Sequence, residues 1–226
     1  MKPLPVNERF HTWQGEGVHL GKSAYFIRFQ GCPVKCPWCD SAGTWHPDWI
    51  PPDVEKANPA DLADAAAGSG CEIVVLTGGE PTIHDLTDLT TELSGRGLPI
   101  HVETCGGYPF RGHFDWVTLS PKWWQLPLNE NLRLADEIKI IVEDTESIAK
   151  WAGELKGRYQ ADIVWLNPEW SQVKNPQVLE SISNWVKTHG KPYRAGYQLH
   201  KVYDVDRLDP GARPLAPLGG DPAKGC

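Results

Sequence analysis

Three closely spaced cysteines are the residues best suited to chemistry in this 226-residue chain. Cys32, Cys36 and Cys39 lie within eight residues, and the two prolines between them keep the segment from forming a helix. Three thiolates on one loop can bind a single metal centre. The spacing favours an iron–sulfur cluster and leaves two alternatives open: a zinc site that borrows Asp40 or His46 as its fourth ligand, or a reduced loop without metal.

A second segment whose residues could take part in binding or catalysis is Thr77-Gly78-Gly79-Glu80-Pro81, which directly follows the apolar run 72–76. Glycines allow a ligand to approach the backbone closely, and a glutamate accepts hydrogen bonds from an ammonium group. Alone, such a segment is more often a simple turn. In a chain that also carries the cysteine loop, the sequence favours a cofactor site.

The cysteine loop resembles that of the radical S-adenosylmethionine (SAM) enzymes. It reproduces their C-x3-C-x2-C spacing with an aromatic residue, Trp38, before the third cysteine, and residues 77–81 resemble their GGEP element. A four-iron cluster held by three cysteines has one iron without a protein ligand. The resemblance implies a [4Fe-4S] cluster whose open iron binds SAM, and reductive cleavage of SAM to a 5′-deoxyadenosyl radical.

Other segments resemble the 7-carboxy-7-deazaguanine synthase family over roughly residues 6 to 201. They are Phe10 to Gly17, Arg28, Cys39-Asp40-Ser41, Glu103-Thr104, Ser120-Pro121-Lys122 and Leu199-His200-Lys201. The resemblance implies a radical SAM lyase of queuosine and 7-deazapurine biosynthesis. Such an enzyme converts 6-carboxy-5,6,7,8-tetrahydropterin into 7-carboxy-7-deazaguanine and releases ammonia.

The family resemblance also assigns a substrate site and a magnesium site. The substrate-binding residues it implies are Trp13, Gln14, Gly15, Glu16, Arg28 and Thr77. Arg28 offers a forked cation for the substrate carboxylate, although without the family context it would more often form a surface salt bridge. Ser41 stands where the family binds Mg²⁺ through a hydroxyl, and Mg²⁺ readily takes its other ligands from water and an anionic substrate.

The SAM site that the resemblance implies comes from four parts of the chain. Its residues are Trp38, Cys39, Asp40, Gly79, Glu80, Ser120, Pro121, Lys122, Asn167, Pro168, Glu169 and Trp170. At the last four positions the sequence departs from the usual family residues, and Asn-Pro after a strand is also a common turn. No side chain is predicted to act as a strong acid or base, because positioning the reacting hydrogen and excluding water are the tasks left to the protein.

Two other functions compete with this interpretation. A glycyl-radical-enzyme activase shares the cysteine loop but acts on a protein, and the Gln14-Gly15-Glu16-Gly17 segment argues against it. A zinc-stabilised binding module belongs to a different class. By family resemblance, the partners expected are an electron donor such as flavodoxin or ferredoxin and a second copy of the chain in a homodimer.

Composition excludes other classes of protein. With 22 Lys and Arg against 29 Asp and Glu, the net charge is −7 and no basic cluster suits nucleic acid. No apolar run approaches the roughly 18 residues of a membrane helix, and the first nine residues lack the apolar region of a secretory signal. We therefore expect a cytoplasmic protein with reduced cysteines and a small-molecule partner.

Strands and helices alternate along the predicted chain. The strands expected are Ser23–Gln30, Glu72–Leu76, Leu98–Glu103, Trp116–Leu119, Glu137–Val142, Asp162–Leu166 and Tyr193–Leu199. The helices expected are 58–68, Asp85–Leu93, Thr145–Leu155 and Pro176–Thr188. This alternation predicts a mainly parallel sheet, and the chemically active segments follow the ends of its strands.

The length limits how many strand–helix repeats the chain can hold. A complete eight-fold (β/α) barrel usually needs roughly 250 residues, and only four helices are convincing here. The fold class predicted is therefore α/β, a partial (β/α)6 radical SAM barrel that is reduced in helices. We expect one domain over residues 1–208, with a disordered tail at 209–226 that is rich in Pro and Gly.

Overall fold

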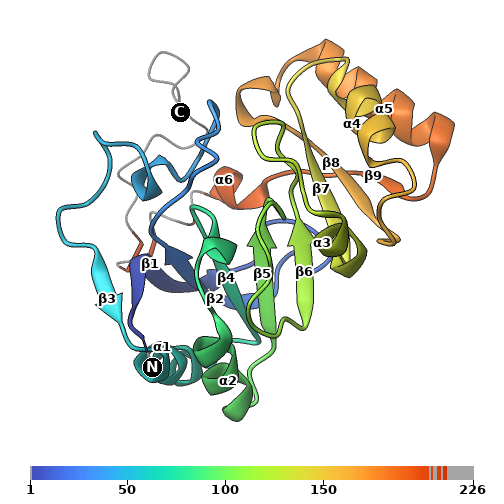
Figure 1. Ribbon diagram of the computed structural model, residues 1–226. Coiled ribbons are helices and arrows are strands. Elements are labelled where there is room, and N and C mark those ends of the chain that lie inside the picture. The colour runs from blue at the N-terminus through green and yellow to red at the C-terminus, as the bar shows by residue number, and fades with distance from the viewer. Residues whose placement is uncertain (1, 204, 206–207, 210, 213–226) are drawn as a thin grey trace.

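A nine-stranded sheet forms the centre of the computed structural model, which describes residues 2–203, 205, 208–209 and 211–212 (Figure 1). Its strands run in the order β3-β1-β2-β4-β5-β6-β7-β8-β9. Their bounds are β1 Leu4–Trp13, β2 Ser23–Phe29, β3 Glu55–Ala57, β4 Ile73–Gly78, β5 Ile100–Thr104, β6 Trp116–Leu119, β7 Glu137–Val142, β8 Val164–Pro168 and β9 Tyr193–Ala195.

The seven strands predicted from the sequence form the parallel part of this sheet. Adjacent strands in the series β2, β4, β5, β6, β7, β8 and β9 pair in parallel register, so all of them end at the same edge. Strands β1 and β3 add an antiparallel margin next to β2. Among the described residues the sheet does not close between β3 and β9. The mainly parallel partial barrel is thereby confirmed.

Helices cover one face of the sheet and complete the core. They are α1 Pro59–Ser69, α2 Thr87–Gly95, α3 Asn129–Leu134, α4 Ser147–Leu155 and α5 Pro176–His189. A sixth helix, α6 Leu199–Tyr203, lies near the ends of the strands, apart from the others (Figure 1). Helices α1 and α2 lie together beneath the first parallel strands, whereas α4 and α5 lie against β7, β8 and β9 (Figure 1). Fully buried side chains from both layers, such as Leu62, Leu76 and Leu89, join one hydrophobic core. Burial of this face holds the strand ends in place.

The first strand was not predicted. Segment Leu4–Trp13 carries prolines and charged residues, yet it forms a ten-residue antiparallel strand along β2. Its buried side chains, such as Val6 and Phe10, are mixed with polar ones that face the pocket or solvent. This two-sided environment weakens the alternating pattern by which a strand is recognised.

The predicted last strand was too long. It ends at Ala195, four residues before Leu199, where helix α6 begins instead. A Cβ at Gly196 would overlap the side chain of Asn167, so the chain turns there next to β8. Helices α3 and α6 and the three-residue strand β3 were also missed, because each is too short for a clear periodicity.

No helix in the described ranges is both long and apolar enough to span a membrane. The domain boundary predicted at residue 208 stays a prediction, and most of the predicted tail, 209–226, lies outside the described residues.

Candidate functional site

A pocket of about 210 Å³ opens at the carboxyl ends of the parallel strands. Most of the residues predicted for the substrate, cofactor and metal sites line it together. They are Trp13, Gln14, Gly15, Glu16, Arg28, Cys32, Cys36, Trp38, Cys39, Asp40, Ser41, Thr77, Gly79, Glu80, Ser120, Lys122, Glu169 and Trp170. Pro121, Asn167 and Pro168 are not part of the lining.

The cysteine loop begins directly after β2 and forms one wall of the pocket. Cys32, Cys36 and Cys39 are free thiols in a cluster with Val34 and Cys105. Burial raises the pKa of all three thiols, and that of Cys36 reaches about 12. Thiolates at these positions therefore need a cation to stabilise them. In the described part of the chain, no group of three or more His, Cys, Asp or Glu side chains is arranged so that it could hold a single metal ion.

Two glycines at the end of β4 bring the Gly-Gly-Glu-Pro segment against this loop. Gly78 pairs with Phe29 across the parallel strands, where a Cβ would approach the Phe29 backbone oxygen to 2.7 Å. A Cβ at Gly79 would overlap the Gly31 carbonyl and come within 2.9 Å of the Cys32 side chain. Glycine is therefore required for the two motifs to meet.

Glu80 ties the end of β4 to the end of β5. Its carboxylate is buried and accepts hydrogen bonds from Thr82, from the Thr104 hydroxyl at 2.5 Å and from the Cys105 backbone N–H at 2.8 Å. Three donors converge on Oε1, whereas Oε2 has one. The side chain thus links the two strand ends. Of its two oxygens, Oε2 has more room to accept a hydrogen bond from the ammonium group of a ligand.

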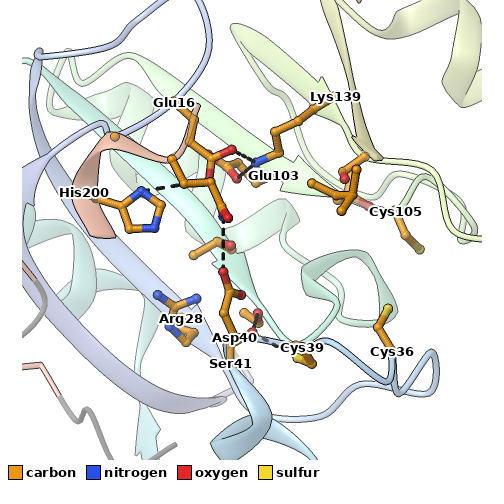
Figure 2. A pocket seen from close by; sticks show the side chains of 18 of the residues that line it. Glu16, Arg28, Cys36, Cys39, Asp40, Ser41, Glu103, Cys105, Lys139 and His200 are labelled. Carbon is orange, nitrogen blue, oxygen red and sulfur yellow. Dashed lines mark hydrogen bonds and ion pairs between the residues drawn. The ribbon is translucent and has the colours of Figure 1, made fainter. Parts of the chain in front are cut away.

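A buried ammonium between two carboxylates occupies the floor of the pocket (Figure 2). Lys139 Nζ lies 3.1 Å from Glu16 Oε2 and 3.0 Å from Glu103 Oε2, and only 9% of the Lys139 side chain is exposed. Burial alone would lower the pKa of Lys139, but the two carboxylates raise it above its usual value. Burial would raise the pKa of Glu103, and Lys139 lowers it. Lys139 and Glu103 therefore carry opposite charges at neutral pH.

Amide groups hold the two glutamates further. Gln14 Nε2 donates to Glu103 at 2.9 Å, and Asn167 Nδ2 donates to Glu16 at 2.8 Å. Asn167, which was predicted to bind SAM, is thus engaged with Glu16. Gln198 Nε2 donates to the other Glu16 oxygen at 3.1 Å.

Helix α6 closes the pocket on the side of β1. Its Leu199 N–H donates to the Gly15 carbonyl at 3.1 Å, and the His200 ring packs where a Cβ on Gly15 would lie. Lys201 Nζ pairs with Asp40 at 2.9 Å. Burial would raise the pKa of Asp40, but Lys201 outweighs this and holds it well below its usual range.

Arg28 and Ser41 lie on the wall formed by β2 and the cysteine loop (Figure 2). Arg28 Nε pairs with Glu8 at 2.6 Å in a salt bridge that is largely buried rather than on the surface, and Arg28 also lines the pocket. Its binding of the substrate carboxylate stays a prediction. Ser41 Oγ donates to the Gly78 carbonyl at 3.2 Å, which leaves its oxygen lone pairs for another partner.

The segments after β6 and β8 also line the pocket, through residues such as Lys122 and Trp170. Lys122 Nζ donates to the Ser120 carbonyl at 2.8 Å and lies 5.3 Å from the centre of the Trp38 ring. Lys201 lies 5.2 Å from the centre of the Trp170 ring in the same way. Two lysines of the pocket thus each lie over an aromatic ring.

Among the lining residues that were not predicted for the site are Glu103, Lys139, Gln198, His200 and Lys201. Lys139 carried a usable signal, since a lysine inside the apolar run 137–142 needs a buried partner. The hydrophobic periodicity of residues 198–201 gave no signal of a site. A strand was predicted through Leu199, so the start of α6 at that residue was missed.

Comparison with known proteins agrees with this geometry. The model of the radical SAM superfamily matches residues 26–122. The 7-carboxy-7-deazaguanine synthase of Synechocystis is 39% identical, with 89% of this chain and 93% of that relative aligned. The chain belongs to the 7-carboxy-7-deazaguanine synthase family.

Further relatives support the placement of this 7-carboxy-7-deazaguanine synthase family member. The synthase of Flavobacterium psychrophilum is 37% identical and aligns with 89% of this chain and 92% of its own length. The crystal structure of QueE from Escherichia coli superposes with a TM-score of 0.70 at 32% identity. That match covers 87% of this chain and 94% of the other. The radical SAM fold predicted from the sequence is confirmed.

Proposed function

We propose that this chain is a radical SAM lyase that synthesises 7-carboxy-7-deazaguanine. The substrate is 6-carboxy-5,6,7,8-tetrahydropterin, and the reaction contracts its ring and releases ammonia. The observation that carries the proposal is that the cysteine loop and segment 14–16 line one pocket, although one follows β2 and the other follows β1. The cofactors are a [4Fe-4S] cluster, SAM and Mg²⁺.

The residues present fit these cofactors. Cys32, Cys36 and Cys39 are soft ligands whose buried thiols require a cation, and the close approach of Gly79 to the loop leaves backbone groups at the pocket surface. The SAM contacts proposed are Trp38, Cys39, Asp40, Gly79, Glu80, 120–122 and 167–170. Together the bound cluster and SAM supply the radical that removes a hydrogen atom from the substrate.

Ser41 is the proposed protein ligand of Mg²⁺. Its hydroxyl group donates its hydrogen to the Gly78 carbonyl, so the lone pairs of the hydroxyl oxygen are left to coordinate a cation. A single neutral ligand suits Mg²⁺, which keeps several waters and takes oxygens from an anionic substrate. The substrate carboxylate can provide such an oxygen.

Polar groups in the pocket match the two ends of the pterin. The trio of Glu16, Lys139 and Glu103 carries one net negative charge and can accept hydrogen bonds from the N–H groups of the ring. Arg28, oriented by Glu8, offers positive charge to the substrate carboxylate. Trp13, Gln14, Gly15 and Thr77 complete the substrate site.

The chain's own contribution is positioning. Glu16 and Glu103 are fixed by ion pairs and amides, so little reorganisation is needed when a ligand replaces water. Enclosure by α6 keeps solvent from the reacting atoms. No strong acid or base is assigned.

The experiment that tests the function uses anaerobically reconstituted protein. We expect about four iron and four sulfide per chain, and formation of 7-carboxy-7-deazaguanine when reduced protein is incubated with SAM, Mg²⁺ and 6-carboxytetrahydropterin. Cleavage of SAM without this product would refute the substrate but keep the superfamily. Stoichiometric zinc without iron would refute the radical chemistry.

We also propose a cytoplasmic location, a flavodoxin or ferredoxin as electron donor, and a homodimer. The free thiols among the described cysteines support a reducing compartment. Activity with each purified donor and sedimentation of the protein at several concentrations would test the two partners.

A further inference from the structure

Glu137 is a buried acidic residue that does not line the pocket. It is the first residue of β7, and only 2% of it is exposed. Trp116 Nε1 and Thr118 Oγ1 donate to its Oε1 at 3.3 and 2.8 Å. Trp165 Nε1 and the Val18 backbone N–H donate to its Oε2 at 2.6 and 3.0 Å. A carboxylate offers about four lone-pair sites, so these donors occupy all of them.

The four donors come from two kinds of structure. Trp116 and Thr118 lie on β6 and Trp165 lies on β8, so the two neighbouring strands of the sheet fix the carboxylate. Val18 instead belongs to the loop that joins β1 to β2. The sheet therefore presents Glu137 Oε2 to this loop at a set place.

The loop lies directly against the carboxylate. Gly17 has a φ of +71°, and a Cβ at this position would overlap Glu137 Oε1. Glycine adopts this backbone conformation without strain and leaves room for the carboxylate. The Val18 N–H can therefore approach Glu137 closely enough to form its hydrogen bond.

Strand β7 holds the loop at two points. Side chains two residues apart in a strand point to the same face, as Glu137 and Lys139 do. Lys139 Nζ pairs with Glu16 Oε2 at 3.1 Å, and Glu137 accepts from the backbone two residues further on, at Val18 (Figure 2). Glu16 is thus held through its side chain by one residue of β7, and through the backbone that follows it by another.

We propose that Glu137 is a positioning residue that fixes Glu16 for binding of the pterin through the Val18 N–H. This inference rests on the proposed function, in which Glu16 contacts the substrate. Glu137 lies outside the pocket lining and acts through the loop. A binding group that is already held in place loses little freedom when the substrate arrives, so the hold on Val18 favours binding.

The test compares three variants in the full, reconstituted chain. Glu137→Met leaves the Val18 N–H without its acceptor, so the KM for 6-carboxytetrahydropterin should rise roughly tenfold, with kcat and iron content within about twofold of the wild type. In Glu137→Gln the amide oxygen can still accept from Val18, and the Thr118 hydroxyl can accept from the amide N–H. The KM of this variant should stay within about threefold of the wild type.

Thr118→Val is the matched control. It removes a donor to Oε1, the oxygen that does not bind Val18. Because Thr118 is buried and also lies outside the pocket lining, its loss should lower the urea midpoint and leave the KM unchanged. A residue with a purely structural role would change stability in the same way without changing the KM.

A second measurement uses the unaltered protein, so it stands even where Glu137→Met does not fold. Val18 is 40% exposed, yet its N–H is bonded to a buried acceptor. Hydrogen exchange followed by nuclear magnetic resonance should therefore show this N–H exchanging about tenfold or more slowly than in an unfolded chain.

Three results would overturn the proposal: an unchanged KM in Glu137→Met, an equal rise of the KM in Thr118→Val, or exchange of the Val18 N–H at the rate of an unfolded chain. Product formation by the wild type in these cases would leave the proposed function intact. A wild type that forms no 7-carboxy-7-deazaguanine would overturn both.

Discussion

Lys139 lies between the carboxylates of Glu16 and Glu103, and a substitution of Lys139 tests how much its positive charge stabilises these two carboxylates. In Lys139→Met, Glu16 and Glu103 would face each other across the buried floor without a cation. We expect the free energy of unfolding to fall by about 3–5 kcal/mol, the usual effect of removing one partner of a buried ion pair. Urea unfolding at pH 7 measures it.

A second variant separates charge from packing. Adding Glu103→Gln to Lys139→Met removes one of the two uncompensated carboxylates, so part of the lost stability should return. Equal stability of Lys139→Met and wild type would show that the three charges do not depend on one another.

Ser41→Ala tests the proposed magnesium ligand. Loss of the hydroxyl should raise the Mg²⁺ concentration needed for half-maximal product formation about tenfold, while the iron content stays the same. The matched control is Ser69→Ala, which removes a hydroxyl that likewise donates to a backbone carbonyl, that of Ala66, in α1. A Mg²⁺ titration of Ser41→Ala that matches the wild type would rule out the assignment.

Cys36→Ala tests the cluster ligands. With two thiolates left on the loop, the reconstituted protein should hold less than a tenth of the wild-type iron and should not cleave SAM. Cys71→Ala is the control, because this thiol donates to the Ala66 carbonyl next to α1 and lies outside the pocket lining. Full iron content in Cys36→Ala would mean that another residue holds the cluster.

Local motifs predicted the residues of the site that lie close together in the chain. The three cysteines were predicted from their spacing, and 14–16 and Thr77 from the resemblance of short segments to a family. Glu103 and Lys139 are far apart in the sequence, and their salt bridge can be recognised only after β5 and β7 are placed in one sheet. The role predicted for Asn167 stays a proposal, since its amide is bonded to Glu16.

At the level of elements, the contact of α6 with β1 depends on one glycine. In Gly15→Ala the new methyl group would overlap the His200 ring, so α6 must move away from the pocket. We expect the KM for the pterin to rise at least tenfold with an unchanged iron content, because the cysteine loop lies on another wall.

Gly153→Ala is the matched control for this substitution. A Cβ at Gly153 in α4 meets no atom within 4 Å, so the KM should not change. The role of α6 would be contradicted if Gly15→Ala bound the substrate as the wild type does.

The elements missed by sequence reasoning are those whose structure comes from tertiary contacts. Strand β1 is stabilised by pairing with β2 and β3 on both sides rather than by a regular pattern of its own. Helix α6 has five residues, too few for a stable isolated helix, and its position follows from the contacts of Leu199, His200 and Lys201. The long parallel strands were predicted because burial on both faces makes them continuously apolar.

For the whole molecule, we expect stability to fall in mild acid. His101 is 6% exposed at the start of β5, with the His19 ring 4.4 Å away. Burial, reinforced by His19, lowers the pKa of His101 to about 4. A lowered histidine pKa stabilises the fold above the unfolded value of 6.5, and this contribution is lost as the pH falls from about 6.5 towards 4.

Between pH 7 and pH 5 the free energy of unfolding should fall by about 2 kcal/mol, since this contribution changes by about 1.4 kcal/mol for each pH unit below 6.5. Urea unfolding at pH 7 and pH 5 measures it. His101→Gln should flatten the dependence over this range, whereas His113→Gln, whose side chain is 70% exposed, should not. Carboxylates such as Asp40, with a lowered pKa, act only at more acidic pH. A dependence unchanged by His101→Gln would place the responsible group elsewhere.

The overall architecture could be predicted because length and periodicity limit it strongly. A chain of 226 residues with few helices leaves room for a partial barrel, and parallel strands bring their carboxyl ends to one edge. The antiparallel margin of β1 and β3 could not be foreseen, since pairing over tens of residues leaves no local trace in the sequence.

Two hydrogen bonds join the start of the chain to its last helix: that between Gly15 and Leu199, and that between Glu16 and Gln198 across 182 positions. During synthesis these bonds can form only after nearly the whole chain has been made. A chain emerging from the ribosome displays residues 13–16 and the cysteine loop long before residues 198–201 leave the exit tunnel. Throughout that interval the pocket has no α6 wall. The nascent chain therefore has a time window in which the cysteines are reachable from the side that the finished protein closes.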